Sequence, residues 1–166
     1  MSQGVGALEA LAVTRATLAY NQIEDRISLT CAVSNNQCVV LWLTARFASQ
    51  LVPHLCQVVA QFPDTLPVAG NAQSPAPESP VVAGADSAAW VVTAIDLTNG
   101  PMLVQLVFRD DQGHAPVLFS MEHHQLAEWS EGLKHCYVQA GWSMDCWHMP
   151  AGATPQSHAA RRVALH

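Results

Sequence analysis

Hydrophobic and polar residues alternate along residues 26–34, and this period of two predicts a strand with one buried face. An Asn-Asn pair at 35–36 follows, and then a nearly continuous apolar run over 37–43. Asparagine tolerates the backbone conformations that tight hairpin turns require. The segments therefore predict a β-hairpin, and an earlier strand at about 11–20 would complete a three-stranded antiparallel meander.

An amphipathic helix is expected after the meander. Apolar side chains recur at intervals of three and four residues from Phe47 to Phe62, which is the spacing of one helix face. Thr44 stands just before this pattern and predicts an N-cap, because its hydroxyl can accept a backbone N–H of the first turn. Pro53 lies inside the pattern and predicts a kink or a break, since proline lacks the N–H donor that a helix interior needs.

The second half of the chain repeats this order of elements. Its expected elements are three strands and one helix, at 90–97, 102–109, 114–120 and 122–140. Turn residues separate the strands, and Gly141 predicts the end of the helix. The apolar segment 142–148 predicts a terminal edge strand.

The chain is therefore expected to contain two β-β-β-α units, at residues 8–62 and 88–149. We expect an α+β fold in which these units pack about an approximate two-fold axis, with antiparallel sheets covered by the two helices around a shared core. Residues 63–87 predict a flexible Pro/Ala-rich linker, because this stretch holds five of the ten prolines. Residues 150–166 predict a disordered tail.

The balance of charge narrows the range of partners. Seven basic residues stand against thirteen acidic ones, for a net charge of −6, and only 12% of residues are charged. Binding to phosphate backbones requires clustered cations, so nucleic acid is not expected as a partner. No run approaches the roughly 18 consecutive apolar residues of a membrane-spanning helix, and no targeting peptide is visible, so we expect a cytoplasmic protein that does not bind membranes.

Familiar catalytic patterns are missing from the sequence. It contains neither a Gly-rich phosphate loop nor a G-x-S-x-G motif. His135 and Cys136 are adjacent, but neighbouring helical side chains point about 100° apart, so the histidine is badly placed as a base for the thiol. The acidic pairs Glu24-Asp25 and Asp110-Asp111 are expected in solvated turns. The sequence therefore favours a non-enzymatic protein.

A metal site is the chemical alternative that the sequence leaves open. Cys136 could approach Cys146 and His148, and the pattern Cys146-x-His148 would direct both side chains to one side of a strand. With Met144 and Met149 nearby, a soft transition metal such as Cu(I) is conceivable. The spacings typical of zinc sites are absent, however, and the common alternative is a set of ordinary histidines and buried cysteines.

Five tryptophans point instead to an interaction surface. Trp42, Trp90 and Trp129 fit core positions of strands and a helix, whereas Trp142 and Trp147 follow the last helix and are less easily buried. Aromatic anchors of this kind are enriched in binding hot spots. We therefore expect a protein-interaction or assembly module that self-associates, as a homodimer for example, with Trp142, Trp147 and Trp129 as candidate interface or ligand-binding residues. The alternative is a binder of a transition metal or small ligand that uses segment 135–148.

Overall fold

The computed structural model describes residues 9–62, 79–148 and 161–165. The first half contains β1 (Leu11–Asn21), β2 (Arg26–Val33), β3 (Cys38–Leu43) and α1 (Ala45–Gln61). The second half contains β4 (Ala88–Val91), β5 (Ala94–Asn99), β6 (Leu103–Arg109), β7 (Val117–Glu122) and α2 (His123–Ala140). A short 3-10 helix, η2 (Asp145–Trp147), and strand β8 (Arg161–Leu165) complete the order.

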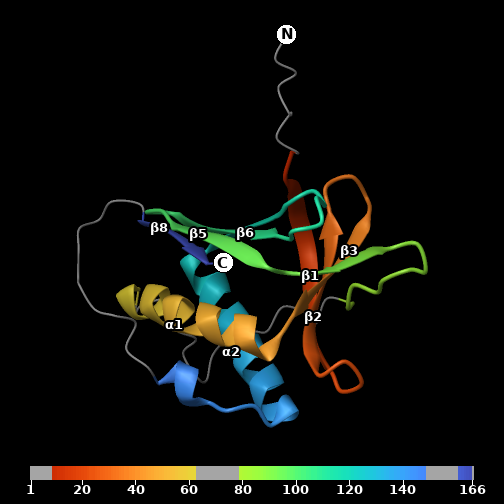
Figure 1. Ribbon diagram of the computed structural model, residues 1–166. Helices are drawn as coiled ribbons and strands as arrows, with labels where there is room; N and C mark the ends of the chain where they lie inside the picture. Colours follow the sequence, from red (N-terminus) through yellow and green to blue (C-terminus); the bar gives the residue numbers. More distant parts are fainter. Residues whose placement is uncertain (1–8, 63–78, 149–160, 166) are drawn as a thin grey trace.

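The strands form a single curled, mixed sheet in the order β4-β3-β2-β1-β7-β6-β5-β8 (Figure 1). The meander β1-β2-β3 and the meander β5-β6-β7 are each antiparallel, but they are joined by a parallel contact between β1 and β7. The expected pair of antiparallel units about a two-fold axis is therefore wrong. A two-fold axis would pair equivalent strands, whereas here the first strand of one half pairs with the last strand of the other.

The expected strand at 90–97 is divided between two places in the sheet. Its first part, β4, pairs in parallel with β3, and its second part, β5, pairs antiparallel with β6. Only Val92 and Thr93 separate these strands. The Val92 N–H donates to the carbonyl of Trp42 at 3.0 Å, and the Thr93 N–H donates to that of Arg109 at 2.9 Å. The bend thus fastens β3 to β6 and holds the sheet in its curled form.

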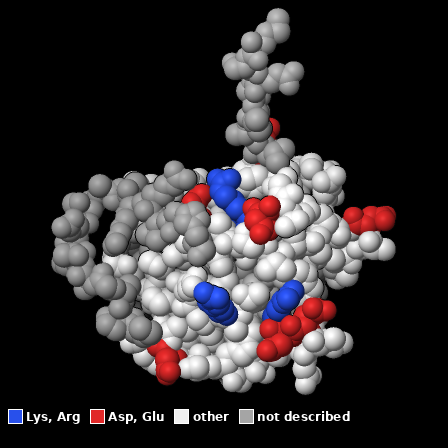
Figure 2. Space-filling model, in the orientation of Figure 1, with Lys and Arg blue, Asp and Glu red and all other residues white. Residues whose placement is uncertain are grey.

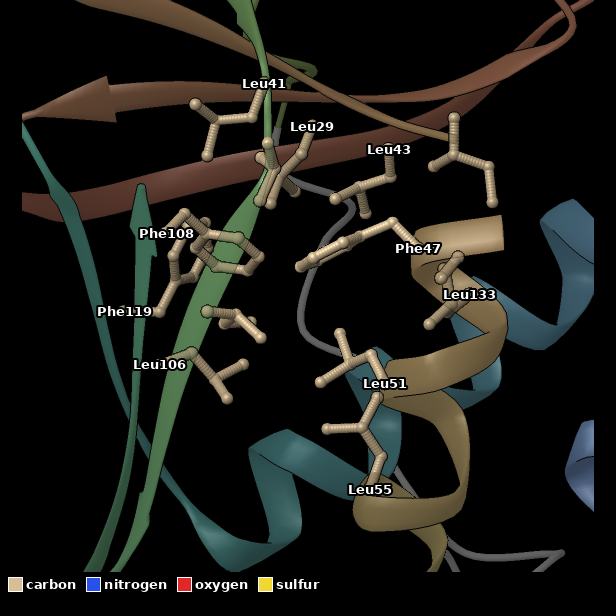
Figure 3. Close-up of a cluster of buried hydrophobic side chains, with 14 of the residues drawn as sticks. Leu29, Leu41, Leu43, Phe47, Leu51, Leu55, Leu106, Phe108, Phe119 and Leu133 are labelled. Carbon is tan, nitrogen blue, oxygen red and sulfur yellow. The ribbon is translucent and has the colours of Figure 1, made fainter. Parts of the chain in front are cut away.

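The two helices lie together on the concave side of the sheet (Figure 1). Leucine and phenylalanine side chains from α1, α2 and both meanders meet there in one core (Figure 3). The expected N-cap is confirmed, since Thr44 Oγ1 accepts the Phe47 N–H at 3.2 Å. The expected interruption at Pro53 is not seen, because α1 continues through this residue to Gln61.

Helix α2 packs where the two meanders separate. The β1–β7 pairing consists of two residue pairs, Leu11 with Val117 and Ala12 with Leu118. Further along β1, the backbone of α2 comes close at Gly132, where an added Cβ would lie 3.6 Å from Leu18 Cδ1. Helix α2 therefore packs on β1 at this position and covers the core beyond the short parallel ladder.

Several expectations concern the ends and connections of the chain. Of the expected linker 63–87, residues 63–78 lie outside the described residues, and Val81 donates its N–H to Thr17 Oγ1 at 2.9 Å. Of the expected tail, residues 150–160 also lie outside them, but 161–165 form β8 on the edge of β5. The edge strand expected at 142–148 is replaced by η2. In the described part of the chain, neither helix is long and apolar enough to cross a membrane.

Candidate interaction site at the tryptophan corner

The end of α2 places Trp142 against the body of the protein. Gly141 closes the helix in a left-handed conformation with φ of +67°, which glycine adopts without the strain that a Cβ would cause. The following N–H, that of Trp142, donates to the Tyr137 carbonyl at 3.1 Å. The chain thereby reverses direction, and the Trp142 ring lies edge-on to the Tyr137 ring, with 5.2 Å between centroids.

The hairpin between β1 and β2 holds the other side of Trp142. Asp25 Oδ1 accepts the indole N–H of Trp142 at 3.1 Å and the hydroxyl of Tyr20 at 2.7 Å. The Tyr20 and Trp142 rings also meet edge-on at 5.9 Å. The hydrogen bonds from Tyr20 and Trp142 lower the pKa of Asp25, because they stabilise its ionised form. Hydrogen bonding to that carboxylate raises the pKa of Tyr20.

Tyr137 is the centre of the aromatic cluster. Its side chain is completely buried, and its hydroxyl lies 2.9 Å from Ser49 Oγ on α1. Burial raises the pKa of Tyr137, so the phenol stays protonated. Trp147 meets Tyr137 edge-on at 5.5 Å, and the ammonium of Lys134 lies 5.9 Å from the centroid of the Trp147 ring. The cluster therefore ties α1, α2 and η2 together.

Two exposed aliphatic side chains lie on the turn and the helix that contact Trp142. Ile23, in the β1–β2 turn, is 94% exposed, and Val138, on the last turn of α2, is 64% exposed. We call the surface formed by Tyr20, Ile23, Asp25, Val138 and Trp142 the tryptophan corner. Figure 1 shows the β1–β2 turn and the end of α2 in the lower part of the molecule. On the face seen in Figure 2, charged side chains are few and scattered.

The structure places the three candidate tryptophans differently. Trp142 belongs to the tryptophan corner, and Trp147 lies behind it against Tyr137. Trp129 lies on α2 about two helical turns before Tyr137. Its ring is tilted against that of Phe119 of β7, with 6.5 Å between the ring centroids. The indole N–H groups of Trp129 and Trp147 are buried and have no hydrogen-bond partner among the described residues. Trp129 is therefore a core residue and Trp147 supports the corner from inside.

The candidate metal ligands are not gathered into a site. Cys136 and Cys146 are buried, whereas His148 is exposed. Among the described residues, His, Cys, Asp and Glu side chains form no group of three that could hold a metal ion. Burial raises the pKa of Cys136, which disfavours the thiolate that a metal would require.

Three residues that contact Trp142 were not singled out as site residues from the sequence. Tyr20 and Tyr137 both meet Trp142 edge-on, and Asp25 was interpreted as an ordinary solvated turn residue. Asp25 has a φ of +49°, a left-handed conformation common for Asp in turns. This local feature gives no indication that a tryptophan more than a hundred residues away would contact it.

The expectation for Asp110 is wrong. Its side chain is 1% exposed, and its carboxylate accepts the Nδ1–H of His114 and, at 3.1 Å, the backbone N–H of the same residue. The His114 ring stacks on Trp90 of β4 at 5.7 Å. The turn between β6 and β7 therefore fastens onto β4 and is not simply solvated.

Comparisons with protein-family models, with curated proteins and with solved structures find no match for this chain.

Proposed function

We propose that this protein is a non-enzymatic interaction module that self-associates through the tryptophan corner. The observation that carries the proposal is the exposure of Ile23 and Val138, two aliphatic side chains on the turn and the helix that hold a fixed aromatic ring. Apolar side chains around a large aromatic anchor are the composition of binding hot spots.

The rigidity of Trp142 supports this proposal. Its ring is held by the hydrogen bond that its indole N–H donates to Asp25 and by edge contacts with Tyr20 and Tyr137. A side chain that is already fixed loses little conformational entropy when a partner covers it. Binding energy from burial of the exposed aliphatic groups is then not offset by the ordering of the anchor.

The charges near the corner are compatible with a second copy as the partner. Glu24 and Arg26 flank Asp25 in sequence, and Lys134 lies against Trp147. A two-fold interface brings the same patch from both copies together, so a patch with charges of both signs can complement itself.

Sedimentation velocity over a range of protein concentrations tests self-association. We expect a concentration-dependent dimer in the wild-type protein. Ile23→Asp should weaken dimerisation at least about tenfold, because the variant places an unpaired carboxylate in an apolar interface. The matched control is Met102→Asp, which introduces the same charge at a 77% exposed apolar residue in the β5–β6 turn and should leave the dimer unchanged. A wild-type protein that stays monomeric at the highest concentration would refute the proposal.

A further inference from the structure

Strand β5 presents a sheet edge that the rest of the fold holds in place. On one side β5 pairs with β6 over six residue pairs, and its Ile95 and Leu97 side chains are buried in the core. On its other side β5 pairs with β8, the last element of the described chain.

The far end of β5 is fixed by side chains from both helices. Asn99 donates from Nδ2 to Gln61 Oε1 of α1 at 3.1 Å, and Asn99 Oδ1 lies 3.0 Å from His123 Nε2 of α2. The His123 ring is stacked on Phe62, with 3.6 Å between centroids. None of these contacts involves β8, so the edge of β5 keeps its position whether or not β8 is bound.

Strand β8 is attached much less firmly. It has five residues, and among the described elements β5 is the one with which it forms a ladder. Its register places Leu165 opposite Ile95 and Val163 opposite Leu97, and Leu165 packs partly buried against the core. Thirteen residues, 148–160, lie between the preceding helix η2 and β8. A short edge strand of this kind can leave while the rest of the sheet keeps its pairing.

We propose that the edge of β5 is a docking site for an extended, positively charged segment of a partner protein, and that residues 161–165 occupy this site when the partner is absent. Such a segment would add a strand antiparallel to β5. Main-chain hydrogen bonds would supply affinity, and alternate apolar side chains opposite Ile95 and Leu97 would supply specificity.

The chemistry of the proposed segment is inferred from the sequence of the chain's own strand. Its sequence is Arg-Arg-Val-Ala-Leu, with two cations followed by apolar residues at alternate positions. Two of the seven basic residues of a chain with net charge −6 are concentrated here. An acidic body attracts a cationic segment over long range and increases its rate of association.

The internal strand must compete with the partner. A short covalent connection to the docking site produces an effective concentration on the order of millimolar there. Wild-type protein should therefore bind an external peptide weakly, and a full-length variant with a weakened β8 should bind it more tightly. This surface is separate from the tryptophan corner, and the proposal does not depend on self-association.

Fluorescence anisotropy of a labelled synthetic peptide with the sequence of residues 158–166 tests the site. We expect the full-length Leu165→Asp variant to bind the peptide at least about tenfold more tightly than wild type, because the new carboxylate weakens packing of the internal strand on the core. A peptide with the same Leu→Asp change should bind neither protein. A peptide with methylated strand amides should also fail, because it lacks the backbone donors. Met102→Asp, outside the edge, should behave as wild type.

Absence of peptide binding to a Leu165→Asp variant that retains the wild-type circular dichroism spectrum would overturn the proposal. Exchange of β8 between two copies would also overturn the proposal, because it would assign the site to a second copy of the chain. Light scattering would show such exchange as a dimer, in wild-type or Leu165→Asp protein, that persists when Ile23→Asp is added.

Hydrogen exchange on wild-type protein gives a measurement that does not depend on the variant. Excess peptide should accelerate exchange at 161–165 and leave 94–99 protected, and unchanged exchange at 161–165 would contradict the proposal.

Discussion

Trp142 donates its indole N–H to Asp25, a residue 117 positions earlier in the chain, at 3.1 Å. The contact joins the end of α2 to the turn between β1 and β2, and Tyr20 completes it by donating its hydroxyl to the same carboxylate oxygen. One exposed turn therefore determines how the C-terminal part of α2 is presented at the surface.

Replacing Asp25 should release the Trp142 ring. In Asp25→Ala the two donors lose their acceptor, and alanine is disfavoured at the left-handed φ of +49°. We expect a lower midpoint of thermal unfolding and a changed tryptophan emission spectrum. Glu24→Gln removes the same charge from the same turn and should change neither. An emission spectrum of Asp25→Ala identical to wild type would show that the turn does not hold Trp142.

The effect of Asp25 should depend on pH. Its pKa is lowered in the folded protein by hydrogen bonds from Tyr20 and Trp142, so its contribution to stability is complete above the ordinary carboxyl pKa of about 4. As the pH falls through the folded-state pKa, the carboxylate is protonated and this contribution is lost. The difference in unfolding midpoint between wild type and Asp25→Asn should therefore be constant near neutral pH and shrink in acid. A difference that grows in acid would have the wrong sign.

The hydrogen-bonded pair Tyr137 and Ser49 should be coupled. Tyr137→Phe deletes the hydroxyl that lies 2.9 Å from Ser49 Oγ and should lower the free energy of unfolding by about 1–2 kcal/mol, since it leaves the half-buried Ser49 hydroxyl without this partner. Ser49→Ala should have a similar cost. In the double variant the two costs should not add, because both changes remove one interaction. Additive losses in urea unfolding would contradict a direct bond.

Gly132 offers a test of the packing between α2 and β1. An added Cβ would lie 3.6 Å from Leu18 Cδ1, which is an ordinary van der Waals distance. Gly132→Ala should therefore raise the free energy of unfolding by about 0.5–1 kcal/mol, because alanine loses less backbone entropy in a helix. Gly132→Ile should lower it by about 1–3 kcal/mol through overpacking. A destabilised alanine variant would show that α2 lies closer to β1 than described.

Asp110 should stabilise the fold at neutral pH. Burial alone would raise its pKa, but hydrogen bonds from the ring and backbone of His114 lower it. Its contribution is therefore present above the ordinary carboxyl pKa and disappears as the pH falls through the folded-state value. We expect Asp110→Ala to lower the free energy of unfolding by about 1–3 kcal/mol at pH 7 and to alter emission from Trp90, which stacks on His114. Asp111→Ala is the matched control and should have little effect.

Local elements of this fold could be predicted because neighbouring residues determine them. The alternation that begins at Ile27 became β2, and its predicted hairpin with the following apolar run is confirmed by the β2–β3 register. The Thr44 N-cap depends on a hydroxyl three residues from its donor. At Pro53 the break that the local rule allows does not occur, since contacts of α1 with the rest of the core keep the helix continuous through a residue that lacks the N–H donor.

The arrangement of the elements could not be predicted in the same way. An apolar run such as 90–97 has the same pattern whether it forms one strand or two, so nothing in it revealed the bend at Val92 and Thr93. The contacts within the candidate site could not be predicted from the sequence for the same reason. The positions of Trp142 and Trp147 just after a helix suggested an exposed surface, but their contacts with Tyr137 and Asp25 depend on how distant segments meet.

The bend at Val92 and Thr93 also bears on how the protein comes apart. One continuous piece of chain supplies a neighbouring strand to β3 and, two residues later, a neighbouring strand to β6. Unfolding of either half of the molecule would therefore remove a strand contact from the other half. Heating should therefore produce a single cooperative transition, and a residue inserted between Val92 and Thr93 should loosen both halves at once.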